Sequence, residues 1–184
     1  GLDALPWTPA ATRLRARVAR LRALDPAAPD WSDAGLLDAL DLWLTPHLAG
    51  MRRAADLVRI DVAAALLGAL DWETRARLDR LFPESVETPA GPRRPIAYDR
   101  DPPTASVRAQ ELYGLDAQPR LGETPLTLEL LSPAGRPIAT TADLPGFWRG
   151  GWADARKDMR GRYPKHDWPE RPWEATPTAR RRRG

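Results

Sequence analysis

Residues 147–170 read FWRGGWADARKDMRGRYPKHDWPE, a stretch in which aromatic rings alternate with cations. A helix is expected from residue 152 to about residue 161. If helical geometry persists across Gly150-Gly151, then Trp148, Trp152, Ala155 and Met159 line one stripe. We expect this stripe to pack on a sheet, with the cations at its side. Rings and cations at this density are typical of a segment that both holds a domain together and contacts a partner.

The second half of the stretch, residues 163–169, contains Pro164 and Pro169. Each proline disfavours the α region for the residue before it. We therefore expect this segment to lie extended across the surface, held there by Tyr163 and Trp168.

Upstream of this stretch, prolines are dense from residue 83 and the apolar spacing shortens towards two. This pattern predicts three short strands, a short helix and then a hairpin, at residues 85–88, 95–99, 104–107, 108–113, 126–131 and 136–141. The predicted fold class is α+β: a helical unit, then a small, mainly antiparallel sheet, a short C-terminal helix and an extended basic tail. The same order of elements also fits a small five-stranded barrel of the oligonucleotide-binding kind, which stays open as an alternative.

The N-terminal part, residues 1–82, has the spacing of amphipathic helices. Thr8 before Pro9 predicts the start of the first helix, and Asp61 and Asp71 predict the starts of two later ones. Between them, one helix should bury its leucines and tryptophan, namely Leu36, Leu37, Leu40, Trp43 and Leu44. The predicted domains are a helical unit at 1–82, a small β-rich domain at 83–170, and a disordered basic tail at 171–184.

The net charge of +3 is unevenly distributed. Residues 147–184 contain 11 Lys+Arg and 5 Asp+Glu, a net charge of +6, which leaves residues 1–146 at −3. A basic end on a mildly acidic body suits a phosphate-bearing partner or an acidic protein surface. Biased coding composition explains the arginine excess as well as a binding role does. The run Arg180 to Arg183 fits a solvated tail and a non-specific nucleic-acid contact equally well.

Motifs for catalysis are missing from the chain. It contains neither a G-x-x-x-x-G-K-[ST] phosphate loop nor a G-x-G-x-x-G turn, and no cysteine that could form a disulfide or a thiolate metal site. The two histidines are His47 and His166, and the pair of His166 with Asp167 reads as an ordinary surface contact. We therefore expect no catalytic residue, no metal site and no bound cofactor in this chain. No run of about 18 apolar residues could span a membrane.

Several segments of the second half can be compared with a known family: Leu130-Leu131-Ser132-Pro133, Asp143-Leu144, Phe147-Trp148, the run from Arg160 to His166, and Trp168-Pro169. They resemble the C-terminal domain of bacterial HrpB-type, DEAH-box ATP-dependent helicases. Upstream, Gln110-Glu111-Leu112 and Trp43-Leu44 are similar to the middle and the helical lead-in of the same domain.

The resemblance implies an accessory region of a helicase. The motor domains, which hydrolyse ATP with Mg²⁺, would lie before Gly1 in the same polypeptide. The protein would be cytoplasmic and would not bind a membrane. Its nucleic-acid partner would be RNA in preference to DNA. The residues expected to bind nucleic acid are Arg149, Arg156, Lys157, Arg160, Arg162, Tyr163, Lys165 and Trp168. The alternative is a protein-docking module with no direct nucleic-acid contact, in which the segment 163–169 holds the domain against the motors or another protein.

Overall fold

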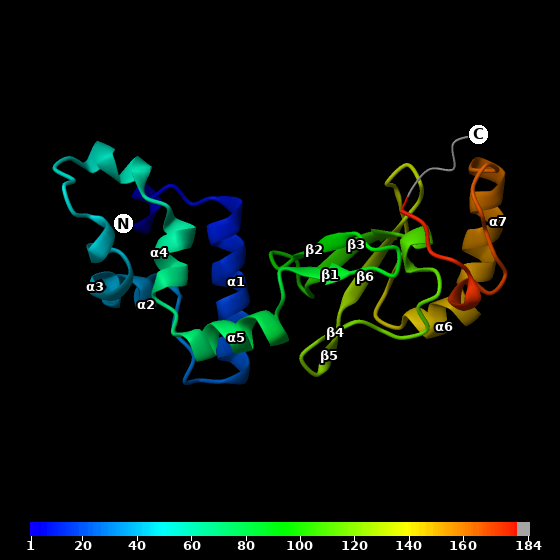
Figure 1. The fold of residues 1–184 in the computed structure, drawn as a ribbon, viewed down its shortest axis with the longest axis horizontal. Helices are drawn as coiled ribbons and strands as arrows, with labels where there is room; N and C mark the ends of the chain where they lie inside the picture. Colours follow the sequence, from blue (N-terminus) through cyan, green and yellow to red (C-terminus); the bar gives the residue numbers. More distant parts are fainter. Residues whose placement is uncertain (180–184) are drawn as a thin grey trace. The chain divides into compact units, whose positions relative to one another are not determined.

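The computed structural model describes residues 1–179 (Figure 1). By its internal contacts the chain divides into two compact units, Gly1–Pro83 and a second unit that begins at Glu84. The first unit is helical and the second contains every strand of the described residues, so the α+β class is confirmed. Within residues 1–179, no helix is both long enough and apolar enough to cross a membrane.

Side-chain caps start the main helices of the first unit. Thr8, Ser32, Asp61 and Asp71 each accept a hydrogen bond from a backbone N–H three residues later, which satisfies a donor that has no partner within the helix. The helices and 3₁₀ turns of this unit are η1 (Leu2–Ala4), α1 (Pro9–Leu24), α2 (Asp33–Asp38), α3 (Leu40–Trp43), η2 (Thr45–His47), η3 (Ala54–Arg59), α4 (Val62–Gly68) and α5 (Trp72–Leu81).

The core of the first unit forms where α1 packs on α4 and α5. Leu14, Val18 and Leu21 of α1 are buried, as their spacing predicts. The single helix predicted around Trp43 is wrong, because the chain breaks between α2 and α3 at Ala39. Leu36 and Trp43 are buried as predicted, whereas Leu37 is 45% exposed.

The second unit is built on an open sheet in the order β1-β2-β3-β6-β7. The pair β3 and β6 is parallel and the other neighbouring pairs are antiparallel. The strands are β1 (Ser85–Glu87), β2 (Arg93–Ala97), β3 (Thr104–Arg108), β6 (Thr127–Leu131) and β7 (Pro137–Thr141), and a separate small hairpin joins β4 (Arg120–Leu121) to β5 (Thr124–Pro125).

The barrel alternative is wrong, because among residues 1–179 the edge strands β1 and β7 pair only with their inner neighbours. The parallel strands β3 and β6 are joined by a crossover connection, which contains η4 (Ala109–Leu112) and the small hairpin of β4 and β5. Side chains alternate along the central pair: Val107 and Leu130 are fully buried, whereas Ser106 donates a hydrogen bond of 2.7 Å to Glu129 on the other face.

Two helices follow the sheet, α6 (Leu144–Arg149) and α7 (Trp152–Arg162), and lie beside one another (Figure 1). Asp143 caps α6 through the N–H of Gly146. The chain then runs without regular structure to η5 (Pro172–Glu174).

Residues 171–179 were predicted to be part of a disordered tail, but their backbone is hydrogen-bonded to the rest of the second unit. The carbonyl of Pro172 accepts a hydrogen bond of 2.8 Å from Gly114, and the N–H of Thr178 donates one of 2.9 Å to Gln110. These backbone bonds attach the segment to the crossover, which composition alone could not indicate. The predicted role of Arg180 to Arg183 lies outside the described residues.

Candidate nucleic-acid interface

A cluster of buried rings holds the stretch 147–170 in place. Trp152 lies 5.1 Å from Trp148, 6.0 Å from Tyr113 and 6.0 Å from Trp168, measured between ring centroids. The indole nitrogen of each tryptophan also donates a hydrogen bond to a backbone carbonyl. Trp148 donates to Leu115, Trp152 to Pro169, and Trp168 to Tyr163. The stripe predicted from spacing is therefore buried, and the partners of its rings are the crossover and the extended segment.

Trp168 belongs to this cluster, which decides its role. Its side chain is 6% exposed, so its ring faces are covered and not presented to a base. Tyr113 donates a hydrogen bond of 3.0 Å from its hydroxyl to the carbonyl of Asp167. Burial, and secondarily the charge of Asp167, raises the pKa of the Tyr113 phenol, which stays protonated and keeps this bond.

Arg149, the first predicted contact residue, is engaged within the domain. Its two terminal nitrogens donate to the two carboxylate oxygens of Asp116, each at 2.7 Å. This bidentate pair lowers the pKa of Asp116 and raises that of Arg149. The guanidinium also stacks on Trp173, 4.4 Å from the ring centroid.

Arg156 is also engaged. Its Nε donates a hydrogen bond of 2.6 Å to the carbonyl of Trp168, and a terminal nitrogen lies 3.3 Å from a carboxylate oxygen of Glu170. With 22% of its side chain exposed, it joins α7 to the extended segment. The structure thus assigns Arg149 and Arg156 to holding the domain together.

Two further predicted residues have weaker internal contacts. Arg162 forms an exposed ion pair of 3.1 Å with Asp158, one helical turn earlier, and such pairs contribute little to stability. Tyr163 is half-buried, and its hydroxyl lies 3.3 Å from the hydroxyl of Ser132 in the turn between β6 and β7.

Lys157, Arg160 and Lys165, here called the α7 cation set, are exposed, and within residues 1–179 none of them forms an ion pair. Arg160 also lines a cavity of about 360 Å³ together with Arg156, His166 and Trp168. The eight predicted site residues therefore divide into those that hold the domain together and those that remain available to a ligand.

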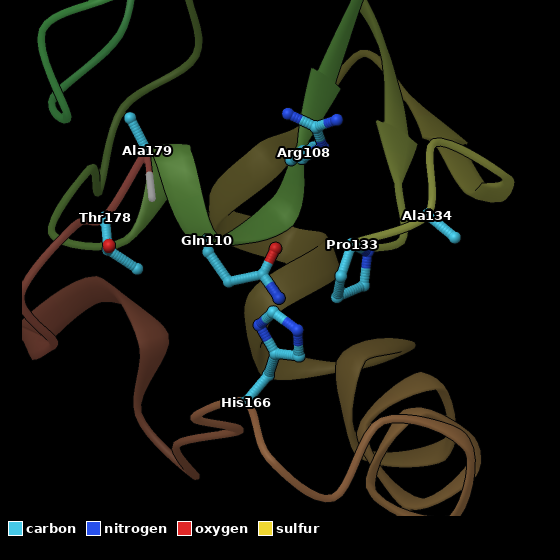
Figure 2. Close-up of a pocket in the computed structure, with 7 residues that line it drawn as sticks. All are labelled: Arg108, Gln110, Pro133, Ala134, His166, Thr178 and Ala179. Atoms are coloured by element: carbon cyan, nitrogen blue, oxygen red, sulfur yellow. The ribbon is translucent and has the colours of Figure 1, made fainter. Parts of the chain in front are cut away.

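A second cavity, of about 300 Å³, was not predicted. It is lined by residues from the end of β3, the turn after β6, the extended segment and the C-terminal segment: Arg108, Gln110, Pro133, Ala134, His166, Thr178 and Ala179 (Figure 2). His166 lines both cavities. In the sequence, Gln110 was noted only for the resemblance, and His166 for the resemblance and for its pair with Asp167. No local signal indicates that Gln110 and His166 meet. Within residues 1–179, no group of three His, Asp or Glu side chains could hold a metal ion.

Comparison with known proteins identifies the family. Residues 43–172 match the family described as ATP-dependent helicase C-terminal, HrpB_C. The chain is 43% identical, over 98% of its length, to the ATP-dependent RNA helicase HrpB of Escherichia coli strain K12, of which it spans 23%.

Two crystal structures of E. coli proteins are also similar to the chain. One, of the DExH-box NTPase HrpB, is 42% identical over 98% of this chain and 23% of its own length, with a TM-score of 0.91. The other, of the DEAH/RHA helicase HrpB, is 40% identical over 91% of this chain and 22% of its own, with a TM-score of 0.77. The chain belongs to the family of HrpB-type ATP-dependent helicase C-terminal regions.

Proposed function

We propose that the chain is an accessory region of an ATP-dependent DEAH-box helicase and that it binds single-stranded RNA through the α7 cation set. Motor domains elsewhere in the same polypeptide would use ATP and Mg²⁺, and the protein would act in the cytoplasm. The choice of RNA over DNA is supported by the similar E. coli protein, whose name describes an RNA helicase. The chain spans 23% of that protein, which agrees with a role as one region of a larger helicase.

The observation that carries this proposal is the position of the three cations. Lys157 and Arg160 lie on α7, which the ring cluster fixes against the domain, and Lys165 lies on the extended segment that Trp168 holds down. Their charges are not neutralised within residues 1–179, in contrast to those of Arg149 and Arg156. Cations held on a fixed surface can each displace a counterion from a phosphate, which favours binding to any single strand.

The test is a titration of a labelled single-stranded oligouridylate with the full chain at low salt. A triple variant, K157A/R160A/K165A, should lose about tenfold in affinity, since exposed ionic contacts contribute roughly 0.5 kcal/mol each and about 1.4 kcal/mol is tenfold. A control variant, R52A/R53A/R80A, removes the same charge from exposed positions of the first unit. Equal losses in both variants, or no binding by the unchanged protein, would contradict the proposal.

The docking alternative is supported by other side chains than those predicted. The rings of the segment 163–169 are used internally, but the first unit exposes large apolar side chains, including Leu42 at 76%, Val58 at 69% and Trp72 at 80%. Exposed apolar groups of this size suit contact with another protein domain. Affinity for isolated motor domains that changes little with salt, and that falls in a W72A variant, would favour docking.

A further inference from the structure

The cavity in Figure 2 is lined only by residues of the second unit, from four segments of the chain that include the turn after β6. Gln110 follows β3, His166 follows the short turn after α7, and Thr178 belongs to the C-terminal segment. The figure shows the amide end of Gln110 pointing toward the His166 ring, in the middle of the lining residues. The name 110/166 pocket is used below for this cavity.

An unsatisfied donor lies in the 110/166 pocket. Gln110 is 4% exposed, and its side-chain nitrogen Nε2 is buried with no hydrogen-bond partner within the described residues. The main chain of the same residue is satisfied, because its carbonyl accepts the N–H of Thr178 at 2.9 Å. Buried polar groups in folded proteins are nearly always paired, so an exception at the wall of a cavity indicates a missing acceptor.

The charge of the pocket also favours an acceptor that is negative. Arg108 lines it with 45% of its side chain exposed, and its nearest carboxylate, that of Glu111, is 3.9 Å away. Glu111 is fully buried and already accepts two hydrogen bonds from Arg94, at 2.7 Å and 2.5 Å. The charge of Arg108 is therefore only partly compensated, and no Asp or Glu is among the residues that line the pocket.

We propose that the 110/166 pocket binds a phosphate group. The Nε2 of Gln110 and the guanidinium of Arg108 would donate to phosphate oxygens, which accept several hydrogen bonds at once and pair well with arginine. The cavity volume of about 300 Å³ leaves room for more of the ligand than a single phosphate. Two sources share this chemistry, a phosphodiester of RNA and the phosphate of a free nucleotide.

The pocket connects to the proposed RNA surface through His166, which lines both the 110/166 pocket and the cavity beside Arg160. A strand bound to Arg160 and Lys165 could thus place one of its phosphates in the pocket. This RNA source rests on the proposed function, whereas the phosphate site itself does not.

The experiment follows the side-chain amide signals of ¹⁵N-labelled full chain by nuclear magnetic resonance, with three probes: inorganic phosphate, uridine monophosphate and a single-stranded oligouridylate. The Gln110 signals should shift saturably with at least one probe, and should be identified by their loss in a Q110L variant. In an R108A variant, affinity at this signal should fall at least tenfold. R136A, which removes an exposed arginine from the nearby β6–β7 turn, should leave it unchanged.

Each outcome decides the proposal. No shift of the Gln110 signals with any probe, or equal losses in R108A and R136A, would overturn it. A variant with Arg180 to Arg183 replaced by alanine separates the pocket from the terminal charges, and loss of the shift in that variant alone would also overturn it. RNA binding that needs the α7 cation set, with the Gln110 signals unshifted by all three probes, would contradict the pocket and keep the proposed function. Phosphate or nucleotide binding in the pocket without RNA binding would keep the pocket and contradict the proposed function.

Discussion

The cations of the stretch 147–170 differ between its inner side, which faces the rest of the domain, and its outer side, which is exposed. On the inner side, Arg149 and Arg156 meet a carboxylate and a backbone carbonyl and hold elements together. On the outer side, Lys157 and Arg160 are exposed and form no ion pair within residues 1–179. A count of charges treats all four alike. What separates them is whether the fold brings an acceptor to each, and this is what the following predictions test.

The largest effect is expected from the ring cluster on the inner side. Trp152 is 1% exposed and contacts four other rings. A W152A variant should lose about 3–5 kcal/mol of stability in the second unit, because a large cavity replaces the ring. Urea denaturation, followed by near-ultraviolet circular dichroism, measures this. The matched control is W72A, whose ring is 80% exposed, and its change should stay within about 0.5 kcal/mol.

An intermediate effect should separate the two sides directly. An R156A variant leaves the carbonyl of Trp168 without its donor, so we expect the free energy of unfolding to fall by about 1–2 kcal/mol. K157A, one residue along the same helix, should leave stability unchanged and weaken RNA binding. If R156A were neutral for stability and K157A destabilising, the division into an inner and an outer side would be wrong.

The smallest effect concerns pH. The bond from Arg149 holds the pKa of Asp116 below its ordinary value of about 4, so the folded state binds the proton less readily than the unfolded state. The stabilisation is fully present above about pH 4 and is lost as pH falls through the lower folded pKa. A D116N variant should therefore lose stability at pH 7, and this loss should become smaller at an acidic pH below about 4.

Thermal melts at the two pH values check this prediction. A D99N variant is the control, because Asp99 is an exposed carboxylate of the same unit. A D116N deficit that stays constant with pH would show that the ion pair with Arg149 is not its cause.

Much of the fold could be predicted from local signals in the sequence. The caps Thr8, Asp61 and Asp71, the strand spacing after residue 83 and the prolines of the segment 163–169 each act within a few residues, and the corresponding elements are present. What could not be predicted depends on distant partners. The barrel is excluded because, within residues 1–179, the edge strands β1 and β7 pair only with their inner neighbours, and no local pattern fixes which strands pair.

The candidate site shows the same limit. Asp116 is 33 residues from Arg149, and the carbonyl that Arg156 meets belongs to Trp168, 12 residues away. Arg17 in the first unit belongs to an arginine-rich run whose charges are typical of a solvated helix face. It is buried instead, donating to the carbonyl of Phe82, 65 residues away. An arginine-rich pattern therefore predicts cations, and only the fold decides which of them a ligand can reach.

The central claim is that the outer cations contact phosphates. The most direct measurement is the slope of the logarithm of the oligouridylate binding constant against the logarithm of salt concentration, for the full chain and for K157A/R160A/K165A. Three phosphate contacts on a single strand contribute a slope of about −2. We predict that the variant's slope is shallower by about that amount, and that R52A/R53A/R80A keeps the original slope. Equal slopes for the unchanged protein and K157A/R160A/K165A would contradict the claim.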